Sequence, residues 1–302
     1  MIRLSLALAL ALAWQTGAAQ APPVFHAESR LVVVDVTVRD EAGGTRSGLD
    51  QAAFTVFEDG TRQPIAIFMG ENVPVSLGIV IDNSGSMRDR RAKVEAAALA
   101  FARASNPLDE LFVVNFADKA RVDVPFTNDA AALEAGIGRA DAIGGTAMRD
   151  AIDLAATYLL QRAKRDRKVL LLITDGHDNA SEISAQRVRT QAEHNAVAIY
   201  AIGLPHENGS AAGRARRELD ELTEATGGVS RHVASLDEAA AAAVDLALQI
   251  RQQYTLAFSP ANRRLDGSFR KIRVVVKAPG HVTVRSRDGY FATPDATRGN
   301  PR

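Results

Sequence analysis

Oxygen-bearing side chains occupy alternate positions immediately after an apolar run at residues 79–81. Asp82, Ser84 and Ser86 carry one carboxylate and two hydroxyl groups, and Gly85 lies between the two serines. In an extended segment alternate side chains project to the same side, and glycine lets the backbone turn. We therefore expect the three side chains to converge on one point, although a turn followed by a helix cap would use the same residue types.

Two later positions carry matching oxygen donors. Thr146 follows a pair of glycines and opens a helical pattern, and Asp175 directly follows the apolar run at residues 169–174. Ligands of open α/β sheets bind beyond the carboxyl ends of the strands, where both residues are expected. Carboxylates and hydroxyls are hard donors that suit Mg²⁺, Mn²⁺ or Ca²⁺. The predicted metal ligands are Asp82, Ser84, Ser86, Thr146 and Asp175, with water or an outside acidic group completing the shell.

The elements that position these residues alternate between strands and helices over residues 73–252. Apolar runs typical of buried strands lie at residues 75–81, 111–116, 169–174 and 197–203. Helical patterns lie at residues 90–104, 147–163, 184–195, 214–226 and 237–253. Continuous apolar strands that alternate with helices indicate a mostly parallel sheet covered on both faces. The predicted fold class is a doubly wound α/β domain.

Both flanks of this domain have the pattern of β-strands. Residues 22–72 contain β-branched and alternating runs with an Asp59-Gly60 turn signal, and residues 253–292 contain three further runs. Three short strands are too few to form a stable core alone. We therefore predict a β-sandwich built from both ends of the chain, the alternative being two independent β-appendages.

The two termini are predicted to lie outside the folded part. Residues 1–21 have the pattern of a signal peptide, with Arg3, an apolar core at residues 4–14 and small residues before Ala21. The alternative is an uncleaved membrane anchor, but the apolar core is short against the roughly 20 residues that span a bilayer. Residues 293–302 are predicted to be a disordered tail. We expect a secreted or periplasmic protein with no stable membrane anchor after cleavage.

The composition of the chain excludes several classes of function. Lys plus Arg and Asp plus Glu number 36 each, so no overall basic charge favours nucleic acid as a partner. The 302 residues include no cysteine, which excludes disulfides, thiolate catalysis and zinc–thiolate sites. None of the six histidines lies in a zinc-ligand pattern.

Through these residues the sequence resembles the von Willebrand factor type A family over residues 73–250. That family's adhesion site uses the pattern D-x-S-x-S with a later Thr and a later Asp, which the five predicted ligands match in order. The resemblance implies that the hydroxyls bind the ion directly, that the aspartates often act through water, and that an Asp or Glu of a protein partner takes the open position. The flanks resemble a group of secreted bacterial proteins that contain this domain.

Catalytic functions fit the site less well than binding does. The G-x-S-x-G pattern of serine hydrolases is absent around Ser84, because Asp82 stands where Gly is needed. A metal-dependent phosphotransferase or hydrolase with Asp82 as nucleophile would need a second nearby carboxylate, and position 84 is Ser. We therefore expect a non-catalytic module that captures an acidic group of a protein partner through its metal. The alternative is a scaffold whose metal is structural.

Three other charged or polar segments could take part in binding or could be ordinary solvated surface. Residues 178–179 are expected to form a solvated loop, the alternative being that they line the rim of the site. The basic residues 161–168 are expected to form a solvated connection, the alternative being a patch that binds an anionic ligand. Arg88, Arg90 and Arg91 could steer an acidic partner or be ordinary surface arginines. His177 is expected to be a loop residue.

Overall fold

The computed structural model describes residues 31–138, 143–205 and 210–293. The predicted signal peptide, and the predicted tail beyond Thr293, lie outside these residues. In the described part of the chain, no helix is both long and apolar enough to cross a membrane.

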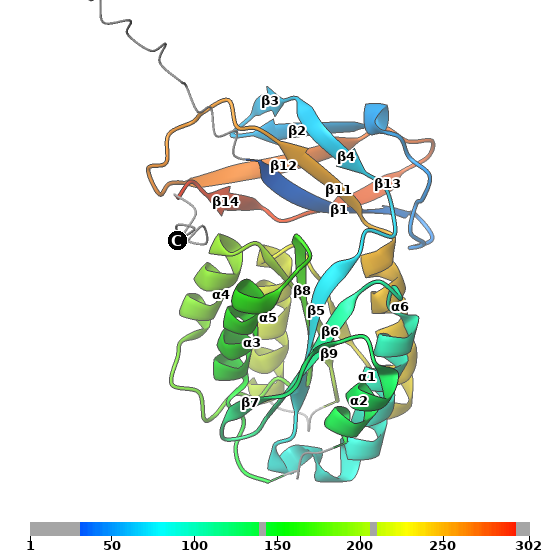
Figure 1. The fold of residues 1–302 in the computed structure, drawn as a ribbon, viewed down its shortest axis with the longest axis vertical. Helices are drawn as coiled ribbons and strands as arrows, with labels where there is room; N and C mark the ends of the chain where they lie inside the picture. The colour runs from blue at the N-terminus through cyan, green and yellow to red at the C-terminus, as the bar shows by residue number, and fades with distance from the viewer. Residues whose placement is uncertain (1–30, 139–142, 206–209, 294–302) are drawn as a thin grey trace, which may run out of the picture. The chain divides into compact units, whose positions relative to one another are not determined.

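A six-stranded sheet forms the centre of the α/β domain (Figure 1). Its strand order is β10-β9-β8-β5-β6-β7, and all neighbouring pairs are parallel except β6 with β7. The strands are β5 (Val75–Asp82), β6 (Glu110–Phe116), β7 (Ala120–Thr127), β8 (Arg167–Thr174), β9 (Val197–Gly203) and β10 (Ser230–His232). The predicted doubly wound, mostly parallel fold is confirmed.

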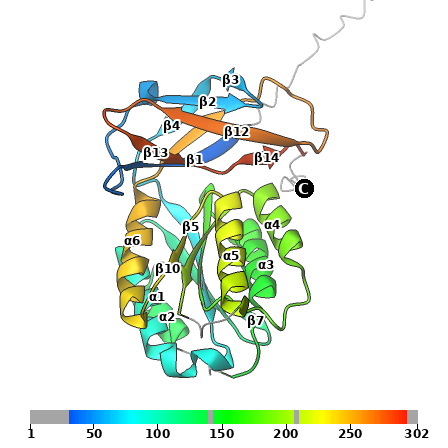
Figure 2. The same cartoon turned by 180° about the vertical axis from the view of Figure 1, so that it is seen from behind.

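Helices cover both faces of this sheet (Figures 1 and 2). One face carries α1 (Arg91–Ala104), α2 (Ala130–Ile137) and α6 (Ala239–Arg251), and the other carries α3 (Met148–Arg162), α4 (Ala185–His194) and α5 (Ser210–Ala225). The central strand β5 is buried along its whole length. Its Ile79 and Ile81 pack in one core and Val80 in the other, because successive side chains point to opposite faces. The described residues also include the short 3-10 helices η1 (Gln51–Ala53), η2 (Gly85–Arg90) and η3 (Leu236–Glu238).

The flanking strands form two four-stranded sheets that share one core. One sheet has the order β13-β1-β11-β4 and the other β14-β12-β2-β3. The strands are β1 (Val32–Asp40), β2 (Phe54–Glu58), β3 (Thr61–Gln63), β4 (Ile65–Met69), β11 (Tyr254–Phe258), β12 (Phe269–Val276), β13 (Val282–Arg285) and β14 (Gly289–Phe291). Each sheet combines strands from both flanks, and one hydrophobic cluster contains Val34, Val56, Leu256 and Val274. The flanks therefore form a β-sandwich and not two separate appendages.

The α/β domain is inserted between two paired strands of this sandwich. The antiparallel neighbours β4 and β11 place Met69 opposite Thr255, so the chain leaves and re-enters the sandwich at adjacent positions.

One arginine connects the amino end of β8 to the sandwich. Arg167 is 2% exposed, and its Nε lies 3.0 Å from Oδ1 of Asp35 on β1. The same guanidinium donates to Oε1 of Gln253 at 2.5 Å and to the carbonyl oxygens of Val73 and Ile250 at 3.1 and 3.3 Å. The prediction of a solvated basic connection is therefore wrong for Arg167, although residues 164–166 before it are exposed.

A second buried polar cluster lies inside the sandwich. Glu58 and Arg270 are each 3% exposed at the side chain, with 3.4 Å between Oε1 and Nη1. The Tyr290 hydroxyl donates to the same Glu58 oxygen at 2.5 Å. Arg270 also donates to the carbonyl oxygens of Asn262 and Arg264. Burial, followed by the hydrogen bond to Glu58, raises the pKa of Tyr290 to about 12, so the phenol remains a donor at neutral pH.

Candidate metal-ion site

Asp82 ends strand β5 at the carboxyl edge of the sheet, beside the end of β8. Its Oδ1 accepts a hydrogen bond from the Ser84 backbone nitrogen at 2.9 Å, and its Oδ2 accepts one from the Thr174 hydroxyl at 2.6 Å. The side chain is therefore held both by the loop that follows β5 and by the end of β8. Burial raises the pKa of Asp82 to about 6 despite these hydrogen bonds. Ionisation of this carboxylate therefore costs free energy unless a positive charge lies nearby.

The two serine hydroxyls connect Asp82 to Asp175. The Oγ atoms of Ser84 and Ser86 lie 3.1 Å apart, and Ser86 donates to Oδ2 of Asp175 at 2.9 Å. Asp82, Ser84 and Asp175 are buried, whereas Ser86 is exposed. Four of the five predicted ligands therefore form one hydrogen-bonded cluster that solvent reaches at Ser86.

Thr146, the fifth predicted ligand, is connected to this cluster through the nearby residue Gly144. The Gly144 carbonyl accepts a hydrogen bond from the nitrogen of Gly85, which stands between the two serines, at 3.0 Å. Gly144 has φ +95°, a conformation that disfavours a side chain. Thr146 itself is buried and precedes α3. The structure thus brings all five predicted residues to one edge of the sheet.

The donor set of this cluster fits a hard divalent cation. It offers carboxylate and hydroxyl oxygens, which Mg²⁺ and similar ions prefer, and one of its carboxylates is buried at a cost that a cation would offset. Among the described residues, this cluster included, no three His, Cys, Asp or Glu side chains gather in a way that could hold a metal. A cation site in this part of the chain therefore depends on hydroxyl donors as well as carboxylates.

Of the neighbouring arginines, Arg90 lies beside the cluster. Its Nη1 is 4.0 Å from Oδ2 of Asp175, and the same atom donates to the Pro205 carbonyl. Arg88 is exposed. Arg91 forms an ion pair with Glu95 at 2.6 Å and also donates to the Gly138 carbonyl. A positive charge is therefore held at the rim of the cluster by Arg90 in particular.

Several residues that support the cluster were not predicted from the sequence. Thr174 holds Asp82, as described above, and its position as a polar residue in an apolar run was an available signal. Asn83, the residue between Asp82 and Ser84, is buried and donates to Oδ1 of Asn115 at 2.8 Å. Asn115 in turn donates to Oδ2 of Asp123 on β7 at 2.8 Å. These contacts join distant positions and leave no short sequence pattern.

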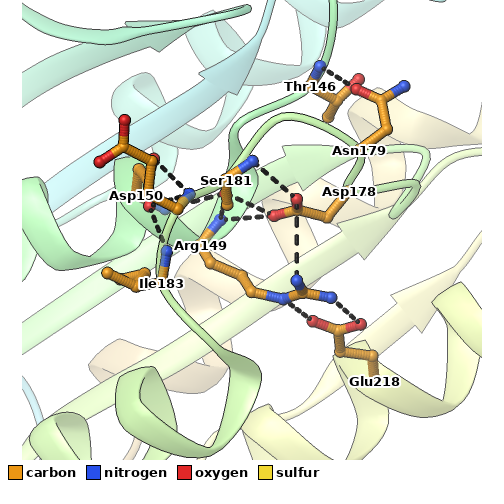
Figure 3. A network of polar contacts seen from close by, with 9 residues as sticks. Thr146, Arg149, Asp150, Asp178, Asn179, Ser181, Ile183 and Glu218 are labelled. Carbon is orange, nitrogen blue, oxygen red and sulfur yellow. Dashed lines mark hydrogen bonds and ion pairs between the residues drawn. The ribbon is translucent and has the colours of Figure 1, made fainter.

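The loop after Asp175 is more than a solvated connection (Figure 3). The Asp178 side chain is 2% exposed, and its Oδ2 accepts from the Arg149 backbone nitrogen at the start of α3 at 2.9 Å. The solvated interpretation is therefore wrong for Asp178. Asn179 is exposed, but its Oδ1 accepts from the Thr146 nitrogen at 2.8 Å. His177 is partly buried, and its backbone nitrogen donates to Oδ1 of Asp175 at 3.4 Å.

Fold and site together define an α/β domain with an oxygen-donor site at the carboxyl edge of its sheet. Residues 77–177 match the family model of the von Willebrand factor type A domain. The resemblance to this family is therefore confirmed over residues 77–177 of the α/β domain.

Two solved structures illustrate the fold. A von Willebrand factor type A protein from Catenulispora acidiphila is 16% identical, with a TM-score of 0.52, over 90% of this chain and 76% of that one. Proximal thread matrix protein 1 from the mussel byssus, with a zinc-occupied MIDAS motif, is 19% identical with a TM-score of 0.51, over 64% of this chain and 49% of that one. Comparison with curated proteins gives no match.

Proposed function

We propose that this protein is a secreted or periplasmic, non-catalytic binding module that captures an acidic side chain of a protein partner through a divalent cation. The ion would be Mg²⁺, Mn²⁺ or Ca²⁺, and its ligands are Asp82, Ser84, Ser86, Thr146 and Asp175. The observation that carries the proposal is the hydrogen-bonded chain from Asp82 through the two serines to Asp175. It gathers hard oxygen donors at an edge of the sheet that is open to solvent at Ser86.

The arrangement supports binding in preference to catalysis. When bound, the cation supplies a positive charge that a partner's carboxylate can coordinate. Asp82 is hydrogen-bonded to Ser84 and Thr174 and buried, so it is placed to hold an ion and is poorly exposed for attack on a substrate. Arg90 adds a positive charge at the rim, which favours an acidic partner. The zinc-occupied MIDAS motif of the mussel thread matrix protein is a precedent for an occupied site on this fold.

Metal binding is tested by the melting temperature of the purified protein in EDTA and in ~10 mM Mg²⁺ or Mn²⁺. A dissociation constant of ~1 mM would stabilise the folded state by about 1.4 kcal/mol, a shift of roughly 3–5 °C for a protein of this size. We expect Ser86→Ala and Asp82→Ala to abolish this shift. Ser86 is the sharper choice because it is exposed and its loss leaves the core intact.

Ser268→Ala is the matched control, since Ser268 is an exposed serine of the sandwich that hydrogen-bonds to Asp266. The melting temperature of this variant should rise on metal addition as much as that of the parent protein. An unchanged melting temperature of the folded parent protein in both ions would count against the metal site.

A metal-bound protein could still be a scaffold that uses its sandwich to bind partners. Binding of peptides with and without Glu or Asp, measured in Mn²⁺ and again in EDTA, separates the two functions. Capture that requires both the acidic residue and the metal supports the proposal. Capture that persists in EDTA and in Ser86→Ala would favour the scaffold.

A further inference from the structure

The segment from Gly144 to Ala147 is held by three different loops. The Gly144 carbonyl accepts from Gly85 after β5, and the Ala147 nitrogen donates to the Ala117 carbonyl after β6 at 2.7 Å. After β8, the nitrogens of Asn179 and Ala180 donate to the Thr146 carbonyl at 3.1 and 3.2 Å. Backbone groups removed from water need such partners, and here they come from the loops after β5, β6 and β8.

Two side chains, those of Asp118 and Asn179, also accept hydrogen bonds from the backbone of this segment. Asp118 Oδ1 accepts from the Gly145 nitrogen at 2.6 Å, and Asn179 Oδ1 accepts from the Thr146 nitrogen at 2.8 Å. A Cβ atom at Gly144 would lie 2.1 Å from Asp118 Oδ2, and one at Gly145 would lie 2.8 Å from both Asn179 Oδ1 and Asp118 Oδ1. The pair of glycines is therefore needed for Asp118 and Asn179 to approach the backbone this closely.

Asn179 also connects two of the proposed ligands. It lies on the loop that begins with Asp175, and it both donates to and accepts from the backbone of Thr146. These hydrogen bonds connect the loop that carries Asp175 to the segment that carries Thr146. Asp178, the residue before Asn179 on this loop, accepts a hydrogen bond from the first turn of α3 (Figure 3).

We infer that Asp118 and Asn179 are positioning residues, which orient the Thr146 hydroxyl toward the cation by fixing the backbone nitrogens of Gly145 and Thr146. This inference rests on the proposed metal site. Residues that orient metal ligands typically contribute 10–100-fold to metal affinity. Asp118→Ala and Asn179→Ala should therefore each weaken Mn²⁺ binding about tenfold or more.

Conservative substitutions distinguish the acceptor oxygen from charge. Asp118→Asn removes a negative charge and Asn179→Asp adds one, yet both keep an oxygen that can accept from the backbone. If hydrogen bonding is the cause, both variants bind Mn²⁺ within about threefold of the parent protein, whereas both alanine variants do not. If long-range charge is the cause, Asp118→Asn is as weak as Asp118→Ala, and the inference is overturned.

The dissociation constant for Mn²⁺ is measured by electron paramagnetic resonance of the free ion, and the melting temperature in EDTA is measured in parallel. Both residues are exposed, so we expect the melting temperatures in EDTA to stay within a few degrees of the parent value. Glu182→Ala, at an exposed acidic residue later in the same loop, is the control and should bind Mn²⁺ normally. Normal binding by the alanine variants overturns this inference alone, whereas no Mn²⁺ binding by the parent protein overturns the metal site as well.

Discussion

Arg167→Met is expected to lower the free energy of unfolding by about 3–5 kcal/mol. The guanidinium of Arg167 is almost completely buried and binds Asp35, Gln253 and two carbonyl oxygens. Methionine fills much of the space but leaves these acceptors without a donor, and unsatisfied buried acceptors are costly. Urea unfolding followed by circular dichroism measures the change.

Lys168→Met is the matched control for this prediction. Lys168 is the next residue of β8, and its ammonium donates to the exposed carbonyl of Asp166. We expect its replacement to change the free energy of unfolding by no more than about 0.5 kcal/mol. Equal effects of the two substitutions would mean that the contacts of Arg167 contribute little to stability.

The second large effect is expected in the sandwich. Arg270→Met should also lower the free energy of unfolding by about 3–5 kcal/mol. Its loss leaves the Glu58 carboxylate buried with the Tyr290 hydroxyl as its remaining described partner. Removing the carboxylate as well, in Glu58→Gln with Arg270→Met, should recover part of that loss. The double variant should therefore be more stable than the sum of the two single changes predicts.

A double-mutant cycle built from the four proteins measures this coupling. Agreement of the double variant with the sum of the singles, within about 0.5 kcal/mol, would contradict a direct interaction between Glu58 and Arg270. Tyr290→Phe tests the other partner of Glu58, because it removes the hydroxyl donor and keeps the ring that fills the core.

The sequence was sufficient to predict the elements whose pattern is regular. The central strands are continuous apolar runs, and their alternation with helices indicates a doubly wound sheet. Strand β7 was not predicted, because it is an antiparallel, partly exposed edge strand. Arg121, Asp123 and Pro125 interrupt its apolar residues, and a strand with one solvated face and a proline has a weak signal.

The candidate site was predictable where its residues are close in sequence. Asp82, Ser84 and Ser86 follow the period of an extended segment, which requires no knowledge of the fold. Asp118 and Asn179 contact Gly145 and Thr146 from loops that are far away in the chain. Such contacts depend on how the loops meet at the sheet edge, and local patterns do not contain that information.

For Arg167 the local sequence pattern led to a wrong prediction of exposure. It lies within a run of basic residues, and such a run is typical of a solvated connection. The side chain is buried because β8 begins at this residue and because Asp35, from the distant strand β1, lies next to it. The sequence shows both charges but not their pairing.

The insertion of the α/β domain between β4 and β11 determines how the protein would respond to mechanical tension. A pull between residues 31 and 293 acts on strands of the sandwich, because β1 and β14 both belong to it. As long as β4 and β11 stay paired at Met69 and Thr255, the load passes across that pair and bypasses the inserted domain. The cluster around Asp82 would therefore keep its geometry under tension until the sandwich itself separates.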